Sequence, residues 1–428
     1  MNLLFVSEYY PPSTMGGGEI NLSVTAKSLV RSGLDVTVLT SRQSGLKQKE
    51  LIEGVKVIRT LATGKNPQGL LENFKRSFLF PKSVVSEVLK LCRVQHIDII
   101  HFQGSSIIAA PNLKKLKIPL AATIESYPAL CPKGDRMYRG KEPCNLVCSP
   151  KKFFFCQNQS SEIGKISNRF YLRHNPLFLG YVYSYYRKLN SALSHCHLLA
   201  ISSYVQKVLK LHGLESVVIP NIINSAELGN SNEFPYLKKN PLELGESKIK
   251  PKTFNLLYLG SLTRYKGPQV LLKAIQGLNC HLDLYGDGPL KKKLQQLIKK
   301  NQLDAEIHSP VPYEHIPPLY TAADLIVFPS LWPEPFGRIP LEALAAGKPV
   351  VAFNVGAIPE TVYPGFSHLV TAGNVPELKE AIKKQIMKGT GSLNKSQLEL
   401  EKHKSHLQQF SESSVAQRLI DYYKRLNH

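Results

Sequence analysis

"NLLFVSEYYPPSTMGGGEINLSVTAKSLVRSGLDVTVLTS", residues 2–41, begins and ends with a short apolar run, and the stretch between them has apolar residues at helical spacing. A Pro-Pro turn and a glycine triplet follow the first run, and Gly33 ends the helical stretch. Strand, glycine loop, helix and strand in this order form a βαβ unit, whose two strands are parallel. The sequence therefore predicts an α/β protein with a parallel sheet.

The alternation of strands and helices occurs twice along the chain. Residues 1–224 contain further apolar runs such as "IDIIHFQG" and "CHLLAISS", and residues 253–408 repeat the order in "FNLLYLGSL" and "LEALAAGKPVVAF". The polar stretch 225–252 has no clear period and is predicted to be a linker. An amphipathic helix at 409–428 is expected to cross back to the first half. We predict two Rossmann-like domains with parallel sheets that face each other across a ligand-binding cleft.

The charge of the chain limits the classes of partner. Its 428 residues carry a net charge of +22, which indicates an acidic partner such as nucleic acid, phospholipid or a phosphorylated small molecule. No nucleic-acid-binding domain is recognisable, so nucleic acid is not expected. No secretory signal and no run near the ~20 apolar residues of a membrane span is visible. We therefore expect a cytoplasmic protein, with the inner face of the cell membrane as a candidate docking surface.

Two carboxylates, Glu334 and Glu342, stand eight positions apart in "EPFGRIPLE". Pro340 suits the first turn of a helix, which places Glu342 in that turn and Glu334 on the loop before it. The N–H groups near Gly337 and Arg338 would then point out of the helix start and form an anion site. The pattern favours a diphosphate at this helix end, with one acid near a sugar and the other near a ribose. An acidic helix cap is the simpler alternative.

Two cations, Arg264 and Lys266, follow a predicted strand in "LLYLGSLTRYKG", where they would face that diphosphate. The run "YLGSLTRYKG … LYGDGP … ADLIVFPSLWPEPFGRIPLEALAAGKPVVAFNVGAIPE" resembles the donor half of a family 4 glycosyltransferase of GT-B fold (glycosyl transferases group 1). "MGGGEINLSVTAKSLVRSGLDVTVLT" resembles the glycine loop of the same family, and "VVIPNIIN" its end-of-domain strand. The resemblance covers nearly the whole chain.

The resemblance implies retaining transfer of a sugar from a UDP- or GDP-sugar to a glycan or lipid-linked acceptor, as in bacterial surface polysaccharide or glycolipid synthesis. No catalytic metal or other cofactor is expected. Glu342 would bind the ribose, Glu334 the donor sugar, and Lys266 the diphosphate, where charge develops as the bond breaks. The residues expected to contact the nucleotide sugar are Gly16, Gly17, Arg264, Lys266, Phe336, Gly337, Arg338 and Glu342. The catalytic candidates are Glu334, Lys266 and Glu125.

The sequence departs from the family pattern at three places. Ser261 stands where relatives carry an arginine, which Arg264 is expected to replace, and Ile222 stands where relatives carry a glycine. In "TIESYPALCP", Glu125 and Ser126 stand where relatives carry a histidine and an aspartate. We expect Glu125 to line the cleft and accept hydrogen bonds from sugar hydroxyls.

Other functions remain open at this point. A catalytically impaired relative is one alternative, and a GT-B epimerase acting on nucleotide sugars is another. An NAD dehydrogenase is disfavoured because "MGGGE" is not the GxGxxG fingerprint. His101 matches a different family histidine at a strand end, or is a packed core residue.

Four cysteines, Cys131, Cys144, Cys148 and Cys156, are spaced C-x12-C-x3-C-x7-C. Four thiolates so close in sequence are a candidate structural zinc or iron–sulfur site. The spacing lacks paired CxxC knuckles, so buried cysteines without a metal are the alternative.

Basic and aromatic residues alternate between residues 133 and 190, which hold eleven Lys or Arg and three acids. This pattern predicts a surface that contacts anionic lipid or a charged glycan. A helix with aromatic residues toward the core and a solvated basic face is the competing interpretation.

Overall fold

A computed structural model describes residues 1–13, 16–63, 70–159, 174–223, 253–389 and 397–427. The linker predicted at 225–252 lies outside the described residues. The chain divides into two compact units, of which unit 1 comprises Met1–Ile222 with Glu412–His428, and unit 2 comprises Ile223–Ser411.

Unit 1 is built on an eight-stranded sheet with the order β10-β9-β6-β5-β1-β2-β4-β3. Neighbouring strands are parallel except for β3 and β4, which form an antiparallel hairpin. The strands are β1 (Asn2–Val6), β2 (Asp35–Ser41), β3 (Lys49–Ile52), β4 (Val55–Leu61), β5 (Ile99–Gln103), β6 (Leu120–Ile124), β9 (His197–Ala200) and β10 (Ser216–Val218). The central strands are apolar along their length because helices cover both faces of a parallel sheet.

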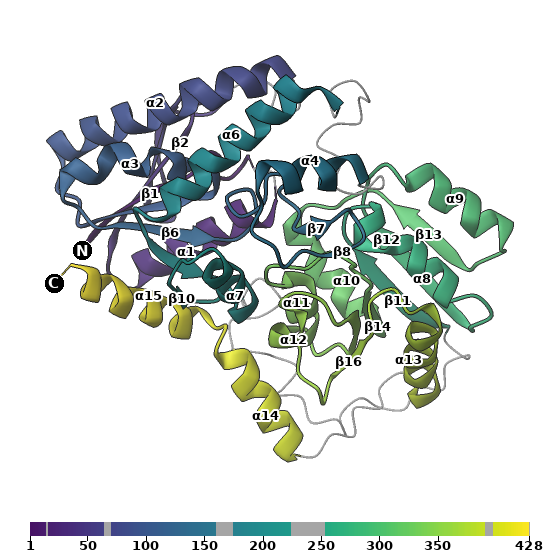
Figure 1. The fold of residues 1–428 in the computed structure, drawn as a ribbon. Coiled ribbons are helices and arrows are strands. Elements are labelled where there is room, and N and C mark those ends of the chain that lie inside the picture. The colour runs from purple at the N-terminus through teal and green to yellow at the C-terminus, as the bar shows by residue number, and fades with distance from the viewer. Residues whose placement is uncertain (14–15, 64–69, 160–173, 224–252, 390–396, 428) are drawn as a thin grey trace. The chain divides into compact units, whose positions relative to one another are not determined.

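The helices of unit 1 lie on both faces of this sheet, with α2, α3 and α6 on one face and α1 and α15 on the other (Figure 1). A small hairpin of β7 (Met137–Tyr138) and β8 (Glu142–Pro143) precedes α4. The helices are α1 (Gly17–Arg31), α2 (Leu70–Val94), α3 (Ala110–Leu113), α4 (Pro150–Gln159), α6 (Pro176–Leu193), α7 (Ser203–Leu211) and α15 (Glu412–Leu426).

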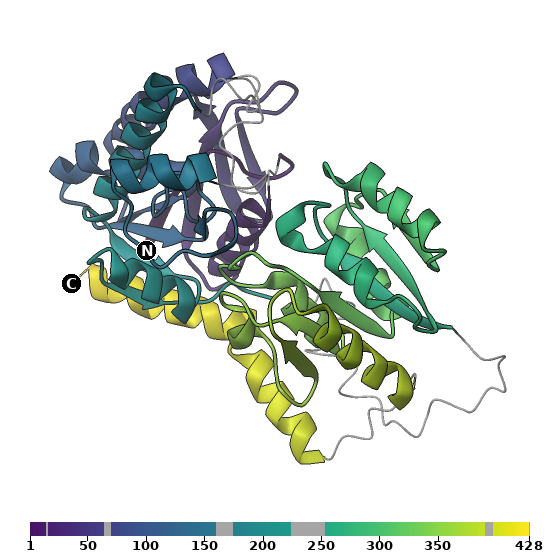
Figure 2. The same ribbon diagram turned by 45° about the vertical axis from the view of Figure 1, so that its right-hand side comes forward.

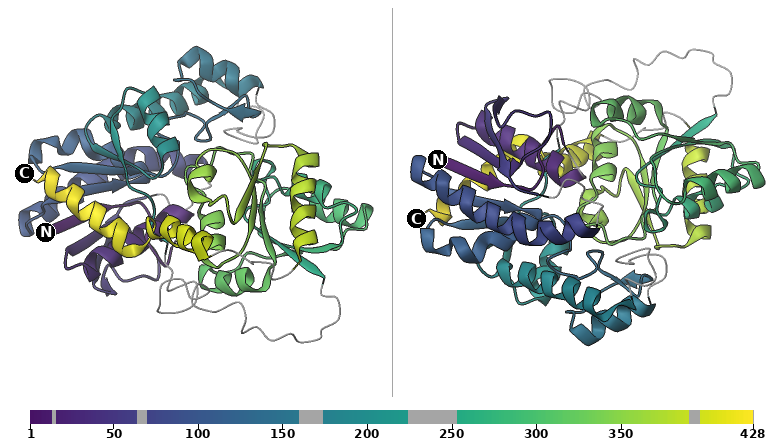
Figure 3. Two further views of the ribbon diagram at one scale, coloured as in Figure 1. Left: turned by 90° about the horizontal axis from the view of Figure 1, so that it is seen from below. Right: turned by 90° about the horizontal axis from the view of Figure 1, so that it is seen from above.

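Helix α15 packs beside α1 although it comes from the end of the chain (Figure 3). Its residues Leu419 and Tyr423 are buried in the core that also contains Phe5 and Leu22. The last helix therefore completes the core of the unit that the first residues begin.

Unit 2 has a six-stranded sheet with the order β13-β12-β11-β14-β15-β16, in which all neighbours are parallel. The strands are β11 (Phe254–Leu259), β12 (Cys280–Tyr285), β13 (Ala305–His308), β14 (Leu325–Phe328), β15 (Val350–Phe353) and β16 (Ser367–Val370). The prediction of two parallel α/β sheets is confirmed.

The helices of unit 2 also form two layers, with α8, α9 and α13 on one face and α10, α11 and α12 on the other (Figures 1 and 2). They are α8 (Pro268–Ala274), α9 (Lys291–Lys300), α10 (Ile316–Ala322), α11 (Arg338–Ala345), α12 (Ile358–Thr361), α13 (Val375–Lys388) and α14 (Gln397–Gln408). None of the helices in the described parts of the chain is long and apolar enough to cross a membrane.

Each sheet reverses its strand order at one place, between β1 and β5 in unit 1 and between β11 and β14 in unit 2. In open α/β sheets, ligands bind at the carboxyl ends of the strands beside such a switch point. The loops that follow these four strands are therefore where a site is expected in each unit.

Candidate active site

The loops after β11 and β14 meet at the switch point of unit 2. Lys266, in the short 3₁₀ turn Arg264–Lys266 after β11, places its Nζ 2.6 Å from Oε1 of Glu334, in the loop after β14. Ser330 donates a second hydrogen bond to the same oxygen, at 2.7 Å. Lys266 also lies over the ring of Trp332, 4.6 Å from its centroid. The carboxylate of Glu334 is thus fixed through Oε1, which leaves Oε2 to accept from a ligand.

A glycine after β15 holds the Glu334 loop in place. Gly356 has φ +56°, and a Cβ there would stand 2.3 Å from the carbonyl oxygen of Glu334. Ala357 donates its N–H to that carbonyl, at 2.8 Å. Only glycine allows this close approach, so the backbone of the loop is set by its neighbour as well as by its own sequence.

Helix α11 begins earlier than the sequence indicated. Gly337, at φ +96°, is its N-cap, and Arg338 is its first residue. Glu342 therefore lies in the second turn, and its expected place in the first turn is wrong. Proline is tolerated throughout the first turn of a helix. The position of Pro340 therefore predicts the first residue of the helix only to within two residues.

Glu342 is almost fully buried and already hydrogen-bonded, with 2% of its surface exposed. Its Oε1 accepts from the hydroxyl of Tyr313, at 2.8 Å, and from Nε of Arg338. Its Oε2 accepts from the hydroxyl of Tyr320, at 2.9 Å. A carboxylate has about four acceptor positions, so one position on Oε2 remains.

The surroundings of Glu342 keep its donors protonated. Burial, and then the charge of Glu342, raise the pKa values of Tyr313 and Tyr320. The Arg338 guanidinium lies 4.7 Å from the ring centroid of Tyr313 and donates to its hydroxyl at 2.6 Å. The Arg338 side chain therefore points toward Glu342. The other arginine expected at the site, Arg264, is exposed to solvent.

In unit 1, Glu125 lies directly after β6 against the start of α1. Asn21 donates to its Oε1 at 2.6 Å, and the Gln103 amide donates to its Oε2. A Cβ on Gly18 would stand 2.7 Å from Oε2, so a larger residue at this position would shift this carboxylate. Gly16 and Gly17 have no atom within 4 Å of the Cβ position. The backbone N–H of Gly16 donates to Oε2 of Glu19, at 3.0 Å.

A buried carboxylate at the end of β1 was missed in the sequence. Glu8 is 5% exposed and accepts from Thr63 at 2.7 Å, from Ser105 at 2.9 Å and from Arg76. An acid directly after a buried strand was a readable signal. Its three partners come from three different segments of unit 1, and the sequence did not indicate them.

His101 is a packed core residue. Its Nδ1 lies 2.6 Å from the hydroxyl of Tyr423 and its Nε2 lies 2.8 Å from Oγ1 of Thr123. Burial lowers the pKa of His101 to about 3. The ring is neutral and both nitrogens are engaged.

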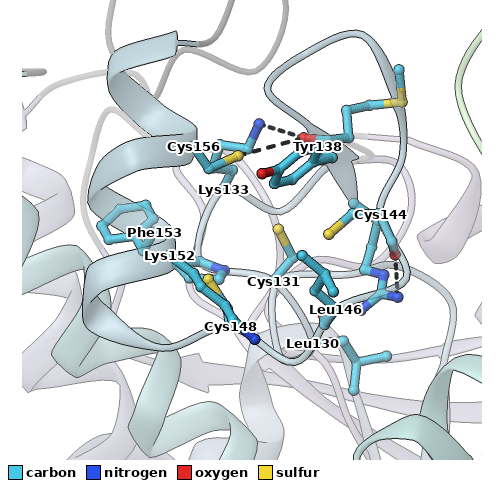
Figure 4. A pocket seen from close by; sticks show the side chains of 13 residues that line it. Leu130, Cys131, Lys133, Tyr138, Cys144, Leu146, Cys148, Lys152, Phe153 and Cys156 are labelled. Atoms are coloured by element: carbon cyan, nitrogen blue, oxygen red, sulfur yellow. Dashed lines mark hydrogen bonds between the residues drawn. The ribbon is translucent and has the colours of Figure 1, made fainter.

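The four clustered cysteines line one cavity of about 30 Å³ in unit 1 (Figure 4). Burial, and then the nearby Cys131, Cys156 and Cys144, raise the pKa of the Cys148 thiol to about 12. Among the described residues, no three His, Cys, Asp or Glu side chains already stand where they could hold a metal ion.

Comparisons with known proteins identify the family to which this chain belongs. Residues 15–227 match the family model "Glycosyltransferase Family 4", and residues 241–400 match "Glycosyl transferases group 1". The fold is that of the GT-B glycosyltransferases. The chain belongs to the family 4 glycosyltransferases.

Individual relatives are distant. An uncharacterized glycosyltransferase of Methanocaldococcus jannaschii is 33% identical over 29% of this chain, a match that spans 36% of that protein. An uncharacterized Klebsiella pneumoniae protein from the cps region is 24% identical over 84% of this chain and 87% of its own length.

Two solved structures share the fold along the whole chain. Sucrose-phosphate synthase from Thermosynechococcus elongatus has a TM-score of 0.70 and 19% identity, covering 99% of this chain and 98% of its own. An Anabaena protein in complex with UDP-glucose has a TM-score of 0.63 and 19% identity, covering 99% of this chain and 100% of its own.

Proposed function

We propose that this chain is a retaining hexosyltransferase that moves a sugar from a UDP- or GDP-sugar to a glycan or lipid-linked acceptor of a bacterial surface polysaccharide or glycolipid. The observation that carries the proposal is the Lys266–Glu334 pair, at the switch point of unit 2 in a chain of this family. The Anabaena structure is a complex with UDP-glucose, and the Klebsiella relative comes from the cps region, which supports the donor and the acceptor class.

The proposed chemistry follows from the charges at this switch point. The bond between the anomeric carbon and the diphosphate oxygen breaks, and its electron pair stays on the diphosphate. The acceptor hydroxyl oxygen forms the new bond on the same face of the sugar and passes its proton to the oxygen of the departing diphosphate. Lys266 stabilises the charge on the departing diphosphate, with Arg264 as the second cation, so no catalytic metal is required. The N–H groups of Gly337 and Arg338 face the same charge.

The two glutamates would bind different parts of the donor. Glu334, held through Oε1, would accept from sugar hydroxyls through Oε2, beside the backbone of Phe336 and Gly337. Glu342 would accept from a ribose hydroxyl at the one remaining position on its Oε2. Oε2 already accepts one hydrogen bond, from the neutral hydroxyl of Tyr320, and the ribose hydroxyl would donate the second.

Unit 1 would supply the remaining contacts. With no side chain at Gly16 and Gly17, the diphosphate could approach the backbone at the start of α1. Glu125, whose two oxygens each already accept one amide hydrogen bond, would accept further ones from sugar hydroxyls.

An exposed apolar and basic surface on unit 1 supports docking at an anionic membrane, where a lipid-linked acceptor would lie. Phe74 and Phe78 on α2 are 48% and 47% exposed, and Lys188 of α6 lies over the Phe78 ring. Phe154 and Phe155 of α4 are 42% and 49% exposed. Such pairs of rings and cations suit the headgroup region of an anionic bilayer. Residues 160–173, which belong to the predicted basic stretch, lie outside the described residues.

The test is a panel of UDP-, GDP- and ADP-sugars with the full chain, read first by thermal shift and then by mass spectrometry of the products. A shift with UDP- or GDP-sugars, followed by sugar transfer to a glycan or lipid acceptor extract, supports the proposal. Interconversion of the donor sugar without any transfer would replace it with an epimerase.

A further inference from the structure

We propose that Cys131, Cys144, Cys148 and Cys156 bind one thiophilic metal centre, a zinc ion or an iron–sulfur cluster, with their four thiolates. The four side chains line one cavity (Figure 4). Both centres are held in proteins by four cysteine thiolates, so the ligand chemistry is shared. This inference does not depend on the proposed transferase activity.

The backbone between these cysteines is held in an unusual conformation. Arg136 and Arg139 have φ +55° and +51°, the left-handed region that non-glycine residues rarely adopt. From this position Arg139 donates its N–H to Sγ of Cys156, at 3.2 Å. Backbone N–H groups directed at sulfur are how proteins stabilise metal-bound thiolates, and strained residues persist where the surroundings fix them.

Buried positive charge surrounds the same cavity. The side chain of Lys133 is 2% exposed, Arg136 is 1% exposed, and both line the cavity. Asp135 is an acid within reach, 3.6 Å from Nζ of Lys133. The Nε of Arg136 is buried and has no hydrogen-bond partner within the described part of the chain.

Lys133 pairs with Asp135 and donates to the carbonyl oxygen of Met137, and Arg136 donates to the carbonyl oxygens of Cys144 and Leu146. Four thiolates around a zinc ion carry a net charge of −2, because the ion neutralises half of their charge. A centre with this charge would be attracted to Lys133 and Arg136, which line the same cavity, whereas neutral thiols would not.

The thiols must turn inward when the metal binds, because no three of these side chains stand at ion-holding positions now. Zn–S bonds are about 2.3 Å long, and a change of side-chain rotamer can bring a cysteine from a cavity wall to its centre. Each thiol releases its proton to solvent as its sulfur binds the metal. The centre would then join the β7–β8 hairpin to α4. The segment that contains β7 and β8 has little regular structure of its own, so the centre would stabilise it.

The experiment measures metal in the full chain, purified both aerobically and anaerobically. We expect about one zinc per chain, or iron and acid-labile sulfide in equal amounts with the visible absorption of a cluster. Cys144→Ser and Cys148→Ser should each lose most of the metal. Cys92→Ser, at a cysteine on α2 outside the cavity, should keep it.

Absence of stoichiometric zinc and iron from both preparations, with no uptake of Zn²⁺ by the reduced protein against a competing chelator, would overturn the proposal. Equal metal loss in Cys92→Ser would also overturn it. If the serine variants fail to fold, the fallback experiment is a Zn²⁺ titration of reduced wild-type protein in which released protons are measured. Binding at thiolates releases protons, whereas adventitious binding at surface carboxylates does not.

Discussion

Asn21 on helix α1 donates a hydrogen bond to Oε1 of Glu125, at 2.6 Å, while the Gln103 amide donates to Oε2. Each oxygen of this carboxylate therefore accepts one amide N–H, from two side chains of unit 1. A glutamine in place of Glu125 would keep both hydrogen bonds only if one of these two amides turned over.

Glu125→Gln should slow transfer about tenfold or more, because a neutral amide has one acceptor oxygen fewer and accepts from sugar hydroxyls more weakly than a carboxylate does. Steady-state kinetics with the identified donor measures the change, and nucleotide binding serves as the control for folding. Transfer as fast as that of wild type would remove Glu125 from the mechanism. His101 would not replace it, because both of its ring nitrogens are engaged inside the core.

Lys266→Ala should lower kcat roughly 100-fold, with a smaller change in KM, because charge on the diphosphate develops in the transition state. Lys273→Ala, an exposed lysine on the neighbouring helix α8, is the matched control and should behave as wild type. A change in KM alone would indicate that Lys266 binds only the ground state of the donor.

Glu342→Ala should weaken nucleotide binding about tenfold or more, since a charged hydrogen bond is worth roughly 1.5–3 kcal/mol. Tyr320→Phe removes a neighbouring donor and leaves the carboxylate in place, so its effect should be smaller. Calorimetry with UDP and GDP compares the two variants. Equal affinity of Glu342→Ala and wild type would contradict the ribose assignment.

Acid should destabilise unit 1 through His101. The folded-state pKa of about 3 lies below the unfolded value of 6.5, so the unfolded chain binds the proton and stability falls as pH drops below about 6.5. The slope between these values approaches about 1.4 kcal/mol per pH unit. Thermal melting from pH 7 to pH 4 should show a steeper loss in wild type than in His101→Asn. Parallel curves would show that another group controls the acid transition.

Binding to vesicles should require acidic lipid and weaken with salt, because the proposed docking surface combines exposed rings with lysines. The double variant Phe154→Ser and Phe155→Ser should sediment less with anionic vesicles. Leu398→Ser, an exposed apolar position on α14 of unit 2, is the control. Binding to neutral vesicles at the same level would argue against this surface.

The parallel sheets were predictable because apolar runs, glycine turns and helical spacing are local patterns. The β3–β4 hairpin was missed although Glu53 and Gly54, at φ +46° and +82°, form the kind of tight turn that an acid–glycine pair indicates. The positions of Glu334 and Lys266 at strand ends also followed from local order.

The partners of the site residues were not predictable in the same way. Tyr313, in a 3₁₀ turn, and Tyr320, in α10, reach Glu342 from 29 and 22 residues away in sequence. Asn21 lies 104 residues from Glu125. Such pairs are created by the packing of distant segments, and no spacing rule in a single sequence encodes them.

The attachment of α15 to unit 1 has a consequence for synthesis. Tyr423 fills the core beside His101, and Arg31 forms an ion pair with Glu412 at 2.6 Å. On the ribosome, the strands and α1 of unit 1 are made before α15, which follows unit 2 in the chain. We expect nascent chains truncated before α15 to expose the apolar face that α1 and the sheet leave open, and to rely on chaperones until α15 is made.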